Sequence, residues 1–260
     1  MRFNVVTARF EEVDTASSKL AVVGSDRDLS WCALKKEADA MVARISAFGL
    51  PKGHPVVIRG HKEADMVVSV VACMMLDHPY IPLDLVVPEE RVRRILDITG
   101  SQLVIDCSAQ PPTYDVSVIA PSGLDRERPV DATKGIPYRS EDPIRYIIFT
   151  SGSTGEPKGV RITREAAGAF LRWMCDDFGF SADDVFVNQA PFSFDLSVYE
   201  LFTSLHIGGT LLLNDSDTAK DSKRFLDRIR QYGGSVWVST PTFAYLYLTE
   251  PDFTGKQVPS

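Results

Sequence analysis

Residues 146–160 read Tyr-Ile-Ile-Phe-Thr-Ser-Gly-Ser-Thr-Gly-Glu-Pro-Lys-Gly-Val and carry the strongest signal in the chain. The first four residues are apolar and predict a buried strand that leads into a loop. Residues 150–159 include three glycines, four hydroxyl side chains and one lysine, Lys158. Glycine lets successive backbone N–H groups approach an anion, hydroxyls add donors, and lysine adds a point charge suited to phosphate. The stretch therefore predicts a phosphate-binding loop.

The spacing separates this loop from two other phosphate motifs. A Walker A loop has the pattern G-x-x-x-x-G-K-[S/T] and runs into a helix. Here Gly152 and Gly155 are three residues apart, Lys158 follows after three more, and residues 160–162 read as extended. The dinucleotide pattern G-x-G-x-x-G does not fit either. A flexible surface linker is the remaining alternative, and the apolar strand before the loop argues against it.

The stretch from Tyr146 to Val160 resembles the signature loop of the adenylate-forming superfamily, which includes acyl-CoA synthetases, luciferases and peptide-synthetase adenylation domains. The resemblance implies that the loop grips the β- and γ-phosphates of ATP, with Mg²⁺ as the accompanying metal. The candidate phosphate-binding residues are then Thr150, Ser151, Gly152, Ser153, Thr154, Gly155 and Lys158. Of these, Lys158 and Thr154 are the candidate catalytic residues. No magnesium ligand can be identified in this portion of the sequence.

A second informative stretch, residues 188–199, reads Asn-Gln-Ala-Pro-Phe-Ser-Phe-Asp-Leu-Ser-Val-Tyr. Asp195 stands between Phe194 and Leu196, where a carboxylate is costly unless a positive group meets it. One interpretation is structural, because Asp195 or Ser193 could cap the helix that follows. The residues alone leave both interpretations open.

The same positions match the amino-acid-activating members of the superfamily. This resemblance implies that Asp195 pairs with the α-ammonium group of the substrate. It also implies that Phe194 flanks the reacting carboxylate, and that Leu196 and Tyr199 line the side-chain pocket. Acyl-CoA synthetases and luciferases have no ammonium group to bind and generally lack this aspartate.

Two further stretches narrow the resemblance. Residues 77–84 resemble the G-x-x-Y-x-P-[LV]-D segment of the amino-acid-activating members, with Asp77 in place of their usual glycine. Taken alone, this stretch predicts a helix end that feeds a proline-rich turn. Residues 188–198 together with 236–243 most closely resemble the D-alanine–D-alanyl carrier protein ligases. The similarity runs from about Ala40 to Pro251.

That resemblance implies a two-step reaction. A small amino acid, D-alanine, is activated with ATP as aminoacyl-AMP and then transferred to the phosphopantetheine thiol of a carrier protein, for the decoration of teichoic acids. Two alternatives stay open: an adenylation domain of a peptide synthetase for another amino acid, or a non-catalytic protein that binds a nucleotide or a partner.

Superfamily members are roughly twice as long as this chain of 260 residues. The segments that hold adenine, ribose and the magnesium-binding glutamate, and the lysine of the small lid domain, are not found. We therefore expect an N-terminal portion that binds nucleotide weakly and does not turn over alone.

The pattern of helical and extended segments indicates an α/β fold with mostly parallel sheets flanked by helices. We expect two approximate lobes, residues 1–60 with 186–260 and residues 61–185. Predicted helices cover about 30–48, 64–76, 88–99, 164–178, 197–205 and 222–232, with a last one from Pro241. Predicted strands cover about 55–58, 103–105, 116–119, 146–149, 185–187, 210–213 and 235–238.

Composition excludes several classes of function. The net charge of −7 gives no general attraction for nucleic acid, and the three arginines at 91, 93 and 94 read as a solvated helix face. The longest apolar run, residues 66–76, is too short for a membrane span. The residues that follow Met1 lack the apolar segment of a signal peptide, so we expect a cytoplasmic protein. The four cysteines are too widely spaced for a disulfide framework or a zinc site.

Overall fold

The computed structural model describes residues 1–11, 18–109, 111–120, 143–151 and 156–248. The strands are β1 (Arg2–Asn4), β2 (Arg9–Glu11), β3 (Leu20–Val23), β4 (Asp28–Ser30), β5 (Val56–Arg59), β6 (Tyr80–Leu83), β7 (Leu103–Asp106), β8 (Ser117–Ile119), β9 (Ile144–Ser151), β10 (Pro157–Thr163), β11 (Val185–Asn188), β12 (Thr210–Leu213) and β13 (Val236–Trp237). The helices are α1 (Trp31–Ala47), α2 (Ala64–Met75), α3 (Glu89–Thr99), α4 (Arg164–Phe178), α5 (Leu196–Ile207), α6 (Ser216–Lys220), α7 (Ser222–Tyr232) and α8 (Pro241–Leu248).

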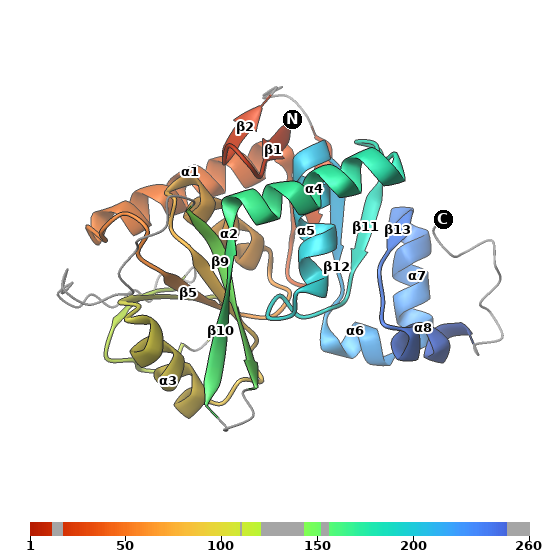
Figure 1. Cartoon of the computed structure of the whole chain (residues 1–260). Coiled ribbons are helices and arrows are strands. Elements are labelled where there is room, and N and C mark those ends of the chain that lie inside the picture. The colour runs from red at the N-terminus through yellow and green to blue at the C-terminus, as the bar shows by residue number, and fades with distance from the viewer. Residues whose placement is uncertain (12–17, 110, 121–142, 152–155, 249–260) are drawn as a thin grey trace.

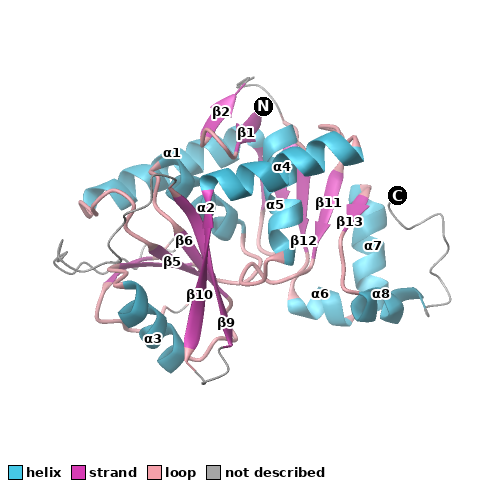
Figure 2. Ribbon diagram, viewed as in Figure 1, coloured by secondary structure: helices cyan, strands magenta, loops and turns pink. Residues whose placement is uncertain are grey.

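Two large sheets organise the described residues (Figure 1). A six-stranded sheet has the order β10-β9-β6-β5-β7-β8, and a five-stranded sheet has the order β13-β11-β12-β3-β4. All neighbours are parallel except the edge pairs β9–β10 and β3–β4, and a separate antiparallel pair joins β1 to β2. The expected class, α/β with mostly parallel sheets flanked by helices, is confirmed (Figure 2).

Each large sheet has core residues on both of its faces, because successive side chains of a strand point to opposite sides of the sheet. In β5, Val56 and Ile58 belong to the large central cluster, whereas Val57 packs with the outer cluster that α3 covers. In β12, Leu211 belongs to the central cluster and Leu212 to the outer cluster formed with α7. The central cluster therefore lies between the two sheets.

Two helices fill that central layer. Ten of the twelve residues of α2 and eight of the twelve of α5 are buried. A helix that is apolar on nearly all sides is one surrounded by protein. Helix α1 packs against α2 and begins at Ser30, whose hydroxyl accepts the N–H of Ala33 at 3.1 Å. Ser30 is thus the N-cap of α1.

Most predicted elements are found, and α4 has the predicted bounds. Strands β1 to β4 and the short helix α6 were not predicted. The proline-rich turn expected within residues 77–84 is wrong, because β6 is a fully buried strand inside the six-stranded sheet. Proline lacks the N–H of a ladder and is normally excluded from inner strands. Here β6 pairs with β9 only at Tyr80, before Pro82 is reached.

Asp77, which stands where related sequences usually have glycine, lies in the turn between α2 and β6. Its backbone φ is 56°, in the left-handed region that aspartate tolerates better than most residues. Its carboxylate accepts a hydrogen bond from Arg164 and lies 3.5 Å from the Nζ of Lys52. The side chain that glycine lacks therefore anchors this turn to α4.

Strands β3, β4 and β11 to β13 form one sheet, and β5 to β10 form the other. Strand β5 ends at Arg59, so it falls in the first lobe by sequence position but pairs within the second sheet. The approximate boundaries themselves stay a prediction.

Candidate functional site

The predicted phosphate loop is carried by the β9–β10 hairpin. Lys158 lies directly opposite Thr150 in the register, and both side chains are exposed. Gly159 lies opposite Phe149, and a Cβ there would come within 2.9 Å of the Phe149 ring. A larger residue at this position would therefore require the Phe149 ring to move.

The described residues bring together only part of the predicted loop. Residues 152–155, which include Gly152, Ser153, Thr154 and Gly155, lie outside the described residues, and so does the side chain of Ser151. Their phosphate-binding roles stay a prediction. Beyond the loop, Glu156 accepts a hydrogen bond from Arg94 of α3 at 2.8 Å. This exposed ion pair ties the second strand of the hairpin to α3.

The 188–199 stretch links the end of β11 to the first turns of α5. Phe192 is buried, whereas Phe194 is 61% exposed and Asp195 is exposed as well. The expectation of a carboxylate enclosed by its apolar neighbours is therefore not met. Asp195 precedes α5, yet its side chain makes no capping hydrogen bond. The capping interpretation of Asp195 is wrong, because the backbone carbonyls of Phe194 and Asp195 itself accept the first N–H groups instead.

Two adjacent pockets meet at Asp195. The first, of about 570 Å³, lies between the hairpin, α3 and the segment before α5, and it is lined by Leu83, Val87, Arg91, Ile95, Tyr146, Ile148, Phe149, Thr150, Val160, Ile162, Ser193, Phe194 and Asp195. The second, of about 440 Å³, lies between α4, α5 and the hairpin, and it is lined by Tyr146, Ile162, Ala166, Ala167, Phe170, Asp195, Leu196, Val198 and Tyr199. Tyr146, Ile162 and Asp195 line both pockets.

The predicted lysine lies on the hairpin face that borders the first pocket. Thr150 and Val160 line this pocket from facing strands. Lys158 is opposite Thr150 and two residues from Val160, so its Cβ points to the same face of the hairpin. Lys158 itself does not line the pocket, whereas Asp195 does. All four predicted substrate residues, Phe194, Asp195, Leu196 and Tyr199, line one or both pockets.

Two tyrosines give these pockets neutral hydroxyl groups. Burial and the nearby charge of Asp195 raise the pKa of Tyr146 to about 12. Burial, followed by the charge of Glu200, raises the pKa of Tyr199 to about 12. Both phenols therefore keep their protons at neutral pH and can donate hydrogen bonds.

Sequence reasoning missed the pocket residues contributed by α4. Ala166 and Phe170 are four residues apart, so they lie on one face of the helix. That spacing was visible in the sequence, but nothing in it indicated which partner the face meets. Arg91, expected on a solvated helix face, also lines the first pocket, while Arg93 pairs with Glu89 at the surface at 2.9 Å.

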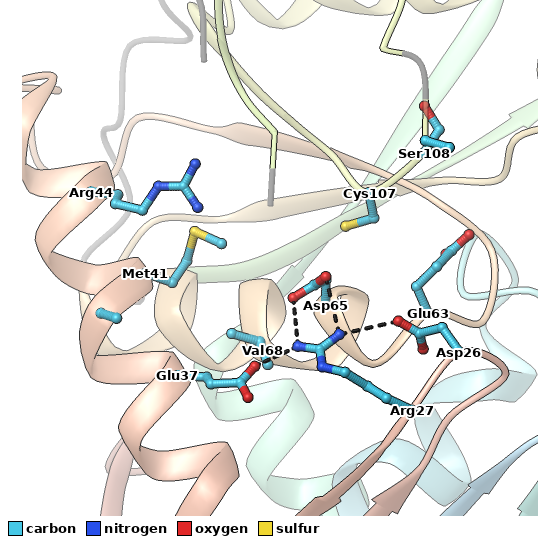
Figure 3. A pocket seen from close by; sticks show the side chains of 12 residues that line it. Asp26, Arg27, Glu37, Met41, Arg44, Glu63, Asp65, Val68, Cys107 and Ser108 are labelled. Carbon is cyan, nitrogen blue, oxygen red and sulfur yellow. Dashed lines mark hydrogen bonds and ion pairs between the residues drawn. The ribbon is translucent and has the colours of Figure 1, made fainter. Parts of the chain in front are cut away.

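A third pocket, of about 620 Å³, contains none of the predicted site residues (Figure 3). Arg27 stands at its wall and donates to Asp65 at 3.0 and 3.2 Å, to Glu37 at 2.5 Å and to Asp26 at 3.1 Å. Burial alone would lower the pKa of Arg27, but the hydrogen bonds and charges of Asp65 and Glu37 raise it. This cluster joins the β3–β4 turn to α1 and α2, and its charges are met within the protein.

One histidine stands in a Ser–His–Asp arrangement that no sequence motif indicates. The Nδ1 atom of His61 lies 2.6 Å from Asp84 Oδ2, and its Nε2 atom lies 3.0 Å from the hydroxyl of Ser216. However, Nε2 also accepts the backbone N–H of Ser216 at 2.9 Å. Its lone pair is therefore occupied, and the ring is poorly placed to take the proton of the hydroxyl as a nucleophile triad requires. The arrangement connects the two sheets.

No group of three or more His, Cys, Asp or Glu side chains in the described part of the chain could hold a metal ion. The four cysteines are free thiols. Across the residues that the structure describes, no helix is long and apolar enough to cross a bilayer.

The sequence has clear relatives. A family model described as AMP-binding enzyme matches residues 10–260. The D-alanine–D-alanyl carrier protein ligase of Bacillus licheniformis is 36% identical over 248 residues, and the match covers 94% of this chain and 49% of that protein. The chain spans about half the length of the curated relatives it matches.

Solved structures agree with this at the level of the fold. CmiS6 superposes with a TM-score of 0.78 at 26% sequence identity, over 91% of this chain and 59% of that chain. ATP-bound MatB from Rhodopseudomonas palustris superposes with a TM-score of 0.77 at 20% identity, over 99% of this chain and 53% of that chain. At that identity the likeness to MatB shows the fold alone.

Proposed function

The chain belongs to the AMP-binding enzyme family, and on that premise we propose that it takes part in activating a small amino acid, D-alanine, with ATP. In the first step a carboxylate oxygen of the amino acid attacks the α-phosphorus of ATP. The bond from this phosphorus to the bridging oxygen breaks, pyrophosphate leaves, and an aminoacyl-AMP forms. In the second step the phosphopantetheine thiol of a carrier protein attacks the acyl carbon, AMP leaves, and the thiol proton passes to solvent.

The observation that carries this proposal is the position of Asp195. Its carboxylate borders both pockets and has no hydrogen-bond or ion-pair partner among the described residues. A carboxylate at the edge of a largely apolar pocket attracts a small cation. An α-ammonium group at Asp195 would direct the amino-acid carboxylate toward the pocket that the phosphate loop borders.

The lining of the second pocket is consistent with an apolar amino-acid side chain. Leu196, Val198 and Ala167 give it apolar walls, and Phe170 and Tyr199 pack against each other with ring centroids 6.4 Å apart. These walls offer contact surface but no second charge. The choice of D-alanine rests on the activity named for the related ligases.

The phosphate loop supports the nucleotide half of the proposal. Thr150 and Lys158 lie at the two ends of the loop. The remaining hydroxyls and amides come from Ser151, Gly152, Ser153, Thr154 and Gly155. Catalysis in such a site consists of positioning and of neutralising phosphate charge. We assign Lys158 and Thr154 to that task. Mg²⁺ would enter bound to the ATP phosphates, and no ligand for it is assigned here.

Three finer points rest on the resemblance to the ligases. They are the phosphopantetheinylated carrier protein as acceptor, the decoration of teichoic acids as end use, and the cytoplasm as location. Because the chain spans about half of those relatives, binding of adenine and ribose is not assigned to its residues. We expect these 260 residues alone to bind nucleotide weakly and not to turn over.

Amino-acid-dependent ATP–pyrophosphate exchange by the full-length product of the reading frame tests the proposal. D-alanine, L-alanine and a mixed amino-acid pool are compared. We expect exchange with D-alanine well above the other two. Exchange with a different amino acid would instead indicate a peptide-synthetase adenylation domain, and no exchange at all would contradict amino-acid activation.

A further inference from the structure

Lys62 is fully buried, which is unusual for a lysine. It lies in the short loop between β5 and α2, where the six-stranded sheet meets the five-stranded sheet. Lysines normally extend along apolar surface and keep the ammonium group in water. The Nζ atom of Lys62 instead points into the protein, so its contacts there require an explanation.

All of those contacts fall on the segment that leads to Asp195. Nζ donates to the side-chain oxygen of Asn188 and to the backbone carbonyl of Ala190, the latter at 2.5 Å. It also lies 4.4 Å from the centre of the Phe192 ring, within the range of a cation–π contact. Residues 189–192 follow the end of β11 and belong to no helix or strand, and the Lys62 side chain contacts the segment 188–192 at three points.

Asn188 extends the contact into α5. Its amide nitrogen donates to Glu200 at 3.2 Å, and its backbone carbonyl accepts the N–H of Asn214 at 2.9 Å. Asn188 and Glu200 are both buried. Glu200 lies in the second turn of the helix that begins after Asp195, so the chain of contacts holds this segment at both ends.

Such an arrangement is costly as a means of packing alone. Burial lowers the pKa of Lys62 to about 7 and raises the pKa of Glu200 to about 8, although each is partly offset by neighbouring charges. Buried ionisable groups are often replaced by apolar side chains without loss of stability. A polar group at such a position has a role when its contact fixes one backbone geometry, because hydrogen bonds are directional and apolar contacts are not.

We propose that Lys62 is a positioning residue for the amino-acid pocket: it holds residues 188–192 in the one path that delivers Phe194 and Asp195 to the two pockets. Lys62 does not line either pocket itself. Its effect on substrate passes through the backbone that it holds. The consequence for amino-acid affinity rests on the proposed function, whereas the consequence for the segment does not.

The test compares Lys62→Met with Lys52→Met in the full-length product of the reading frame. Methionine matches the length of lysine without its charge or donors. Lys52 is a surface lysine whose side chain is 81% exposed, which makes it the matched control. Hydrogen exchange followed by mass spectrometry is measured for peptides that cover residues 188–196, with α3 as an internal reference. Steady-state KM and kcat are measured for D-alanine and for ATP.

We expect Lys62→Met to speed exchange in the 188–196 peptides several-fold while α3 is unchanged. We also expect it to raise the KM for D-alanine about tenfold, because small displacements of a positioned group are costly. The KM for ATP should stay within about twofold, and Lys52→Met should match the wild type throughout. A merely structural role would change thermal stability without separating the two KM values.

Unchanged hydrogen exchange in residues 188–196 of a folded Lys62→Met protein would overturn the inference. If the wild type activates no amino acid, the proposed function fails, and the exchange measurement still decides the role of Lys62. If Lys62→Met does not fold, Phe192→Leu takes its place, because this change removes only the ring beside Nζ. We expect a smaller acceleration in the same peptides, and equal exchange in that variant would likewise overturn the inference.

Discussion

Carboxylates border pockets in two regions of the molecule, and the two regions differ in whether a positive group within the protein pairs with the carboxylate. Asp26, Glu37 and Asp65 converge on Arg27, within 2.5 to 3.2 Å, beside the pocket of about 620 Å³. Asp195 borders pockets of about 570 and 440 Å³ and has no hydrogen-bond or ion-pair partner within the part of the chain that the structure describes.

The difference separates a structural cluster from a candidate binding site. A carboxylate whose charge is met inside the protein links the elements that carry it and leaves little for a ligand. A carboxylate at a pocket without such a partner keeps its full charge for an incoming cation. Pocket volume alone does not separate these two regions, because the Arg27 pocket is the largest of the three.

Removing the unpaired carboxylate should give the largest effect. In the full-length enzyme, Asp195→Ala should raise the KM for the amino acid roughly 30- to 150-fold. This corresponds to a loss of about 2–3 kcal/mol in binding free energy, as expected for a hydrogen bond between charged groups. The KM for ATP should change little. The change is measured by pyrophosphate exchange at varied amino-acid concentration, with Asp217→Ala, an exposed carboxylate on α6, as the control. An amino-acid KM within twofold of wild type would remove Asp195 from the site.

Loss of the loop lysine should have a smaller effect that does not depend on the amino acid. Lys158→Ala should lower kcat/KM by about 1.5–2 kcal/mol, roughly 10- to 30-fold, because loop amides and Mg²⁺ share the phosphate charge with it. Lys223→Ala, a change of a lysine on α7, serves as the control. The measurement is exchange with each of several amino acids. A loss that differs widely among them would place Lys158 near the side-chain pocket instead.

The sequence predicts the part of this comparison that is local. Residues 146–160 predict the strand, the glycine-rich loop and the extended segment after it, and the helix predicted at residues 164–178 has those bounds in the structure. The strand β6 escapes prediction because Pro82 normally excludes an inner strand, and only the limited pairing with β9 makes room for it.

The part of the site that the sequence does not predict depends on tertiary contacts. Phe170 and Tyr199 come from different helices and meet because α4 packs on α5. Lys62 belongs to the polar stretch Arg-Gly-His-Lys-Glu, residues 59–63, which reads as an exposed turn. Its burial depends on contacts with Asn188 and Ala190, more than a hundred residues further along the chain, and no local pattern encodes those contacts.

The free energy of unfolding should depend on pH in a way that reports the pKa of the buried Lys62. The pKa of Lys62 is lowered from 10.5 to about 7 in the folded state. Between those values the unfolded chain binds a proton that the folded chain does not, so the stability contributed by this group rises with pH. Glu200, whose pKa is raised to about 8, acts in the opposite sense below that value, so the comparison is made above pH 8.

Urea unfolding of the wild type and of Lys62→Met at pH 8 and at pH 10 checks this. The free energy of unfolding of the wild type should gain on that of the variant as pH rises. A difference that stays constant over this range would show that Lys62 keeps an ordinary pKa in the folded protein.

The Arg27 cluster should respond to substitution with the smallest effect, and in stability only. Asp65→Asn removes one of the three charges that Arg27 meets, with side chains 36% and 20% exposed. Because water screens such partly exposed pairs, we expect a loss of about 0.5–1 kcal/mol in the free energy of unfolding. Both KM values should equal those of the wild type in pyrophosphate exchange. A clear rise in either KM would mean that the third pocket also takes part in binding, and that a carboxylate with an internal partner can still belong to a functional site.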